Sequence, residues 1–255
     1  MKKGHVLIAV IAVCALAASA FGWGSLISSF RSPASSQFPN GIGYRANYLY
    51  IATNSPDRVF RTNFTGSVVR SHTAPTSTTR GCAAGVMGTT GYYWVANNNP
   101  RRVYRLGYNS GSIYHSFTPP GTDPWGLAFR QSGSNYYLYY TSSSSRRLYR
   151  LNAATGGLQA TYALSFTPRG IGYGDGYLWI ADGAGWIRKC SVTGSTYDRF
   201  RVSQYGYVAG CDYDAVRNQV WVGFNAPGHR ICRFETTSGT TITPTSMGKI
   251  KATFK

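Results

Sequence analysis

Short apolar runs alternate with polar turns along most of the chain, and one unit of this pattern returns every 40 to 45 residues. In each unit the first apolar run is followed by a second apolar run with an aromatic residue in its third place. A third run contains arginine or lysine and leads to a turn that ends in glycine. A fourth, more polar run closes the unit. The units begin with GIGY at Gly41, GCAA at Gly81, GLAF at Gly126, GIGY at Gly170 and GCDY at Gly210. Four short runs per unit, separated by Gly, Asn and Ser turns, predict the four strands of a propeller blade.

Five complete units are visible from about Pro39 to Thr243. The sequence therefore predicts an all-β fold, a five-bladed β-propeller of four-stranded antiparallel blades. A six-bladed ring with a partial blade from both termini stays open as an alternative. The segment LISSF at 26–30 stands outside the five units. We expect it to be a fourth strand that pairs with the last blade, because closing the ring removes a sheet edge with unpaired backbone groups.

The first 20 residues have two lysines, an apolar run from Val6 to Ala17 and small residues at positions 18–20. This is the pattern of a cleavable signal peptide. The apolar run is shorter than the roughly 20 residues that cross a bilayer. Val13 before Cys14 is too bulky for a usual lipoprotein signal. We therefore expect a signal peptide at 1–20, a propeller domain at 21–246 and a basic tail of open role at 247–255, in a secreted protein without a membrane span after cleavage.

The fourth unit carries a family resemblance. The stretch PRGIGYGDGYLWIADGAGWIRKCSVTG, residues 168–194, resembles an NHL-type repeat and the related repeats of YncE-like and virginiamycin-lyase-like propellers. The matching positions are Pro168, Gly170, the turn at Asp175 and Gly176, and Ala181 with Asp182. The resemblance implies the propeller fold, and it does not imply one function, because many unrelated functions share this fold.

Charge is the strongest compositional signal. The chain has 26 Lys and Arg against 8 Asp and Glu, a net charge of +18. Most cations have no carboxylate available as an internal partner, so they face water, counterions or an anionic ligand. We expect an anionic polymer or glycan as partner, such as an acidic glycan, a lipopolysaccharide headgroup or extracellular nucleic acid. The alternative is a structural cell-surface scaffold that charge holds to an acidic envelope component.

In propellers, the loops between second and third strands and the loops between blades emerge on one face, around the mouth of the central channel. The repeat register places eight arginines there, here called the rim arginines: Arg58, Arg80, Arg101, Arg102, Arg146, Arg147, Arg169 and Arg230. The acids of the same face are Asp57, Asp123 and Asp182, which leaves an excess of five positive charges. The sequence therefore predicts a ligand-binding face rich in arginine.

Four aromatic residues accompany the rim arginines: Trp125, Trp186, Tyr205 and Tyr207. A planar ring beside guanidinium groups can stack on a sugar or a base while arginine binds a carboxylate, sulfate or phosphate. A second row of cations lies in the third strands, one per unit: Arg61, Arg105, Arg150, Lys189 and Arg233. For this row we expect a structural role, with the side-chain stems packed on tyrosine rings.

The sequence predicts no catalytic activity, no cofactor and no metal site. Asp182 ends a second strand where the other units carry other residues, mostly small and polar, so a turn role is expected. Asp212 and Asp214 alternate along one strand of one blade, which does not give the flanking pair that glycoside hydrolysis needs. Similar five-bladed propellers of the plant glutaminyl cyclotransferase type rely on a glutamate, and the single glutamate here, Glu235, lies elsewhere. A hydrolase or lyase that uses the three aspartates near the channel is the enzymatic alternative.

Four cysteines follow the signal peptide, which allows two disulfides with three possible pairings. Cys82 and Cys211 share an apolar position of the first strand, where cysteine acts as a small hydrophobe. Of the possible bonds, only Cys190 to Cys211, across neighbouring blades, has a feasible geometry. No spacing of Cys and His suggests zinc.

Overall fold

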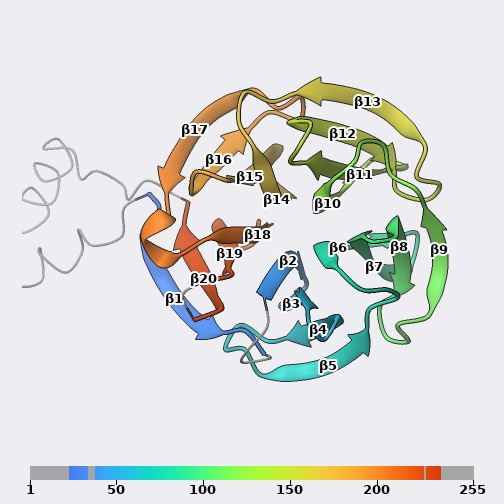
Figure 1. Cartoon of the computed structure of the whole chain (residues 1–255), viewed down its shortest axis with the longest axis horizontal. Helices are drawn as coiled ribbons and strands as arrows, with labels where there is room; N and C mark the ends of the chain where they lie inside the picture. Colours follow the sequence, from blue (N-terminus) through green and yellow to red (C-terminus); the bar gives the residue numbers. More distant parts are fainter. Residues whose placement is uncertain (1–22, 34–37, 227, 237–255) are drawn as a thin grey trace, which may run out of the picture.

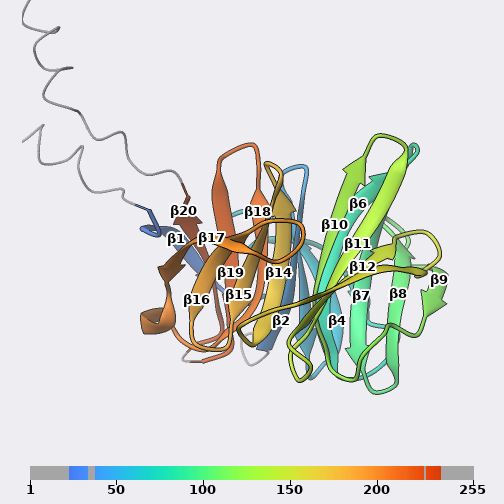
Figure 2. The ribbon, with the colours of Figure 1, turned by 90° about the horizontal axis from the view of Figure 1, so that it is seen from above.

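The computed structural model describes residues 23–33, 38–226 and 228–236, and it shows five four-stranded antiparallel sheets around a central axis (Figure 1). The prediction of a five-bladed propeller is confirmed. Seen from the side, the strands run between two opposite faces (Figure 2). The predicted signal peptide, the end of the predicted domain from residue 237 and the basic tail lie outside the described residues.

The first strand of each blade is innermost, and the fourth is at the outside of the ring (Figure 1). Blade 1 is β2 (Phe38–Arg45), β3 (Tyr48–Asn54), β4 (Arg58–Thr62) and β5 (Val68–Thr73). Blade 2 is β6 (Thr79–Met87), β7 (Thr90–Asn98), β8 (Arg101–Gly107) and β9 (Ile113–Phe117). Blade 3 is β10 (Pro124–Ser132), β11 (Asn135–Ser142), β12 (Arg147–Asn152) and β13 (Leu158–Ala163). Blade 4 is β14 (Pro168–Gly174), β15 (Tyr177–Asp182), β16 (Trp186–Cys190) and β17 (Thr196–Arg201).

Blade 5 joins the two ends of the ring. Its inner strands are β18 (Val208–Asp214), β19 (Gln219–Phe224) and β20 (Arg230–Glu235), and its outer strand is β1 (Leu26–Arg31) from the start of the described chain. β1 runs antiparallel to β20, with Phe30 opposite Ile231. The predicted closing strand is therefore confirmed, and no sixth sheet exists among the described residues. The described part of the chain has one short 3₁₀ turn, η1 (Ser203–Tyr205), and no helix able to cross a membrane.

The recurring glycine at the start of each first strand lets neighbouring blades approach backbone to backbone. A Cβ on Gly81 would lie 2.3 Å from the Trp125 carbonyl oxygen, and one on Gly170 would lie 2.3 Å from the Cys211 nitrogen. A Cβ on Gly41, Gly126 or Gly210 would meet backbone of the neighbouring blade at 2.5, 2.5 and 2.9 Å. No other residue fits, so the glycine that marks each unit is a requirement of close packing around the axis.

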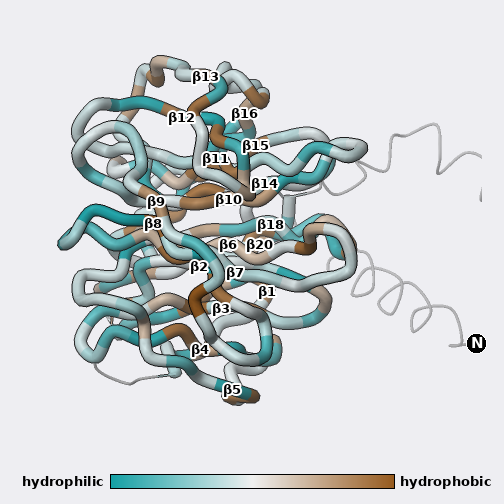
Figure 3. The backbone as a smooth tube through the Cα atoms, turned by 90° about the vertical axis from the view of Figure 1, so that its right-hand side faces the viewer, coloured by the Kyte–Doolittle hydropathy of each residue, from teal (hydrophilic) through white to brown (hydrophobic). Residues whose placement is uncertain are grey.

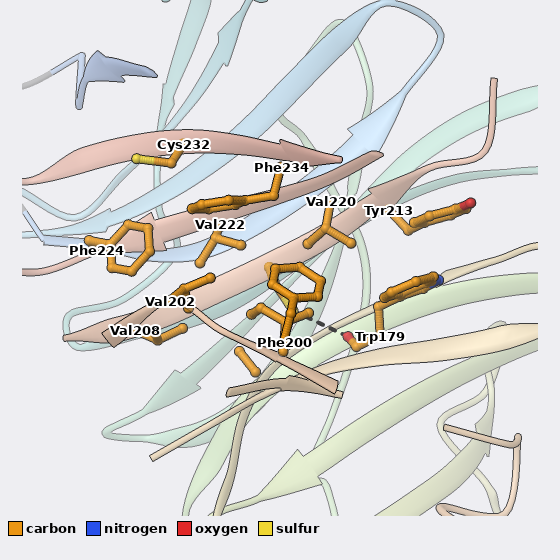
Figure 4. Packing of buried hydrophobic residues seen from close by; sticks show 13 residues of the cluster. Trp179, Phe200, Val202, Val208, Tyr213, Val220, Val222, Phe224, Cys232 and Phe234 are labelled. Atoms are coloured by element: carbon orange, nitrogen blue, oxygen red, sulfur yellow. Dashed lines mark hydrogen bonds between the residues drawn. The ribbon is translucent and has the colours of Figure 1, made fainter. Parts of the chain in front are cut away.

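The aromatic residue in the third place of each second strand is buried in the ring, with 1% or less of its surface exposed: Tyr50, Trp94, Tyr139, Trp179 and Trp221. Trp179, for example, stacks on Tyr213 of the next blade with ring centres 4.8 Å apart (Figure 4). Along the tube, hydrophobic and hydrophilic colours alternate within the strands (Figure 3). Because these buried rings pack against the next blade, the core is a set of apolar layers, each lying between two neighbouring blades.

The second row of cations lies opposite these aromatic residues in the strand register, as in the pairs Tyr50 with Arg61 and Trp94 with Arg105. Each cation covers an aromatic ring of the neighbouring second strand. The distances from charge to ring centre are 5.1 Å for Arg61 over Tyr48, 4.9 Å for Arg105 over Tyr92, 5.2 Å for Arg150 over Tyr137, 4.1 Å for Lys189 over Tyr177 and 5.3 Å for Arg233 over Trp221. The predicted structural role is confirmed.

All four cysteines of the described chain are buried free thiols: Cys82, Cys190, Cys211 and Cys232. The bond between Cys190 and Cys211 that the register allows does not form. Instead, the Cys211 thiol donates a hydrogen bond to the Trp179 carbonyl at 3.2 Å (Figure 4). Burial raises the pKa of the Cys190 thiol to about 11, so it stays protonated at neutral pH.

Candidate anion-binding face

The structure brings the eight rim arginines to one face of the propeller. Arg58, Arg101, Arg147 and Arg230 are the first residues of third strands, and Arg80 and Arg169 are the second residues of first strands. Arg102 follows Arg101, and Arg146 precedes Arg147. First and third strands of an antiparallel blade start at the same end, so these side chains share that face. The ends of fourth strands lie there too, which adds the exposed Arg31 and Arg201 that the sequence analysis did not include.

Two of the rim arginines are tied to the outer strands of their own blades. Arg58 donates from Nη2 to the Ser71 hydroxyl at 2.7 Å, and Arg102 makes the same contact with Ser116 at 2.8 Å. Arg146, Arg147 and Arg230 are exposed. The outer part of the face therefore has anchored and solvated arginines together with the half-buried Arg101, whose Nε is enclosed without an acceptor in the described chain. It surrounds a different arrangement at the centre.

At the centre, two rim arginines share one indole ring. The guanidinium carbons of Arg80 and Arg169 lie 4.5 and 4.7 Å from the ring centre of Trp125. Arg169 also lies 3.8 Å from the ring centre of Tyr207. Arg80, Trp125 and Arg169 are each the second residue of an inner strand, in β6, β10 and β14, and Tyr207 directly precedes β18. These four residues are here called the mouth cluster, because the inner strands surround the channel (Figure 1).

Few groups of the protein offset the positive charges of the two arginines of the mouth cluster. Nε of Arg80 and both Nε and Nη1 of Arg169 are enclosed, and no acceptor among the described residues reaches them. Burial, and then repulsion from Arg80, lower the pKa of Arg169 to about 10, while Asp123 and Asp182 act in the opposite direction. Arg169 therefore remains a cation at neutral pH in surroundings that penalise its charge.

None of the eight rim arginines forms an ion pair with another described residue. The ion pairs of the described chain join Arg188 to Asp182 at 2.7 Å and Arg217 to Asp214 at 3.0 Å. Asp123, the acid nearest to the mouth cluster in sequence, accepts a hydrogen bond from Nε1 of Trp125 at 3.0 Å. The positive excess that the sequence predicts for this face is therefore not neutralised by ion pairing within the propeller.

A cavity of about 480 Å³ opens on this face beside Arg169, between blades 3 and 4. Its lining includes Arg146, Arg169, Asp182, Gly183 and Arg188. Since Asp182 pairs with Arg188, the uncompensated charges in the cavity are those of Arg146 and Arg169. The cavity thus joins an exposed arginine to an enclosed one.

Asp182 has the turn role that the sequence predicts. Its Oδ1 accepts hydrogen bonds from the backbone N–H groups of Ala184 and Trp186, both at 2.9 Å, and its Oδ2 accepts one from Nε of Arg188. The side chain is 1% exposed. A carboxylate with three donors at this depth organises the turn between β15 and β16.

The aromatic residues of the face contact protein groups, which differs from the expected open stacking platform. Trp125 is only 8% exposed and lies under two guanidinium groups. Trp186 lies under Arg199, with 4.4 Å between charge and ring centre, and Tyr205 packs on Phe234 in the core. Tyr207 is 47% exposed, and Arg169 lies over it. The rings therefore position arginines, a use that the sequence pattern did not reveal.

The other two candidate aspartates lie away from Asp182. Asp212 accepts hydrogen bonds from the backbone N–H groups of Tyr44 at 2.5 Å and of Tyr213 at 2.8 Å. Burial raises the pKa of Asp212 to about 8, against the lowering effect of these N–H groups. Asp214 binds Arg217 and the turn after β18. Within the described ranges, no three His, Cys, Asp or Glu side chains gather as metal ligands would.

Comparisons with known proteins agree with this architecture. A family model described as a repeat of unknown function (DUF6923) matches residues 24–178. The glutaminyl cyclase of Myxococcus xanthus is similar in structure, with a TM-score of 0.65 and 9% identity over 84% of this chain and 96% of that one. The WD40 propeller domain of Doa1 has a TM-score of 0.52 and 11% identity over 77% of this chain and 63% of that one. A search of curated proteins found no match.

At such low identity the two structures show a shared fold and nothing about activity. Together with the matching repeat, they support the propeller repeat that the sequence predicts. They do not single out repeats of the NHL or YncE type.

Proposed function

Because this chain belongs to the DUF6923 family, whose repeat has no assigned function, we propose a function from the arginine-rich face itself: the protein is an exported, non-catalytic binding module for an anionic partner. The partner is an acidic glycan or another anionic polymer of the cell envelope or its surroundings, including lipopolysaccharide and extracellular nucleic acid. A kinship with NHL-type and YncE-like propellers belongs to the same proposal and is supported by the glycine and turn positions of the fourth unit.

One observation carries the proposal. Eight arginines converge on one face, and none of them pairs with a carboxylate of the described chain. Surface arginines cost little when solvated, but Arg80 and Arg169 are held against rings with enclosed N–H donors. Their charges stay at the channel mouth without a carboxylate partner, where an anionic ligand can compensate them.

The enzymatic alternative has less support from the geometry. Its three aspartates are hydrogen-bonded within the protein, and Asp182 and Asp214 end strands that run to opposite faces. They do not converge on one reacting atom, as paired acid and base groups do. The scaffold alternative requires only electrostatic attraction to an acidic surface. The experiment below distinguishes it from specific binding.

The test is binding of the exported chain to an array of acidic glycans, lipopolysaccharides and nucleic acids at low salt and at about 0.15 M salt, where the screening length is about 8 Å. We expect a subset of ligands to remain bound at the higher salt. The variant Arg146→Ala/Arg147→Ala should lose this selective binding. The control Arg45→Ala/Arg70→Ala removes the same charge from other parts of the surface and should keep it. A signal that is indifferent to ligand and vanishes with salt would instead support the scaffold.

A further inference from the structure

The most enclosed cation of the face adjoins the cavity between blades 3 and 4. Two of the three guanidinium nitrogens of Arg169 have no surface open to water and no acceptor within the described chain. A guanidinium has five N–H donors in a fixed plane, which match the oxygens of a carboxylate, sulfate or phosphate. Nη2 is therefore the nitrogen left to donate to an oxyanion in the cavity, and the enclosed part of the guanidinium adds its positive charge.

The rings around Arg169 fix its position. With Trp125 and Tyr207 at 4.7 and 3.8 Å from the guanidinium carbon, the side chain has little freedom to move toward solvent. A pre-positioned donor loses less conformational entropy on binding than a free surface arginine does. Arg70, exposed on the outer strand of blade 1, has no such ring contact among the described residues and provides the comparison.

The same contacts limit what kind of ligand the mouth cluster can recognise. The Trp125 ring lies under two guanidinium groups and is nearly buried, so it offers no open face to a base. Binding of single-stranded nucleic acid without sequence preference depends on such open faces. Recognition here depends on charge and hydrogen bonds, which favours a glycan with anionic substituents over single-stranded nucleic acid.

We infer that the cavity beside Arg169 binds one compact oxyanionic group, a phosphate, sulfate or carboxylate, through Arg169 and Arg146, with Arg80 adding positive potential. The inference rests on the proposed function and narrows it to one site and one ligand chemistry. Asp182 and Arg188 form the neutral wall of the cavity. A free inorganic anion and a phosphorylated or sulfated sugar carry the same group, and the two sources are separated below.

The first test is calorimetric titration of the full chain with inorganic phosphate and inorganic sulfate. We expect Arg169→Gln to weaken binding by about tenfold or more, because a lost charge-assisted hydrogen bond is worth that factor. Arg70→Gln makes the same change in net charge away from the cavity, and it should weaken binding by less than about twofold, because exposed charges are screened. Thermal unfolding of each variant confirms that it folds.

A second variant blocks the cavity without changing charge. A Cβ on Gly183 would lie 3.4 Å from Nε of Arg169, an ordinary contact distance, and Gly183 has no positive φ angle that would oppose alanine. Gly183→Ala should therefore fold normally and weaken phosphate binding. Gly157→Ala is the control, since its Cβ also meets one atom at 3.4 Å, but in the turn before β13 on the opposite face. Retained affinity in Gly183→Ala would exclude this cavity as the site.

The outcomes separate this inference from the proposed function. Equal losses in Arg169→Gln and Arg70→Gln would show binding by overall charge, which overturns the inference and leaves the proposed function in place. If the unmodified protein binds no polyanion at any salt concentration, both are wrong. Glucose 6-phosphate distinguishes the sources: tighter binding than inorganic phosphate supports a sugar-linked group, and equal binding supports the free anion.

Discussion

Replacing Arg169 by methionine should stabilise the ligand-free protein while removing anion binding. Burial, and then repulsion from Arg80, lower the pKa of Arg169 from its ordinary value to about 10, and each pKa unit corresponds to about 1.36 kcal/mol between the two protonation states. This gives a penalty of roughly 3 kcal/mol, or about 2 kcal/mol after allowance for partial exposure to solvent. The charged side chain carries the penalty at every pH below about 10, and the penalty is relieved only as the pH rises from there toward the ordinary pKa of arginine.

Two contacts act against this gain. The guanidinium lies over Trp125 and Tyr207, and a cation over a ring at a partly exposed site contributes about 0.5 to 1 kcal/mol. Methionine has a similar length and keeps part of this energy, because sulfur contacts with aromatic rings contribute about 0.3 to 1.5 kcal/mol. The net expectation for Arg169→Met is a gain of about 1 kcal/mol in the free energy of unfolding.

Urea unfolding in a buffer without multivalent anions measures this difference, and an unchanged slope m indicates that the unfolded state is the same. A gain of 1 kcal/mol raises the melting temperature by about 2 to 4 °C in a domain of this size. Arg147→Met, at an exposed position of the same face, should stay within about 0.5 kcal/mol of the original protein. Inorganic phosphate should then raise the melting temperature of the original protein more than that of Arg169→Met.

A fall of more than about 1 kcal/mol in the free energy of unfolding of Arg169→Met, at unchanged m, would contradict this expectation. In that case the arginine would be a structural bridge between Trp125 and Tyr207, with a net favourable contribution from its ring contacts. An enclosed cation that costs stability and is nevertheless present is the pattern expected of a functional residue.

Further predictions concern the core and the ligand. The folded state binds a proton at Asp212 more tightly than the unfolded state does. The free energy of unfolding should therefore fall by a few kcal/mol as the pH rises from about 4 to about 8. Urea unfolding of Asp212→Ala across this range should show a smaller fall. Gly170→Ala should cost more than about 3 kcal/mol by urea unfolding, since its Cβ would lie 2.3 Å from a backbone nitrogen. A thiol reagent should label the native protein slowly and the unfolded protein at all four buried cysteines. An oligonucleotide and an abasic strand of equal charge should bind with affinities within about twofold of each other, whereas open rings would favour the bases by roughly 1 to 3 kcal/mol each.

The repeat explains how much of the fold the sequence predicts. Every blade needs the same three features to pack: a glycine near the start of the first strand, a buried aromatic residue, and a cation that covers a ring. The sequence pattern therefore returns with the period of the blade. That period also predicts which ends of the strands share a face, and hence the rim arginines. Arg31 and Arg201 were missed because they end outer strands, whose more polar pattern varies between units.

The mouth cluster was not predicted because its contacts form between blades. Arg80, Trp125 and Arg169 are separated by more than 40 residues each, and the packing of consecutive blades brings them together. A signal was nevertheless present, since all three directly precede the glycine that starts a unit. Alignment of the units on that glycine places them at one level of the channel, so their contact could have been expected from the register.

At this level of the channel the propeller is symmetric in its backbone and asymmetric in its chemistry. The two remaining blades carry Asn40 and Ala209 before the glycine. The Asn40 amide donates to the Thr79 carbonyl at 2.9 Å and accepts from Asn225, so that side of the mouth is neutral and internally satisfied. Positive potential is therefore greatest toward blades 2 to 4, next to the cavity at Arg169. A ligand drawn by charge would settle off the axis, and a ring of equivalent blades would thus present a single binding site.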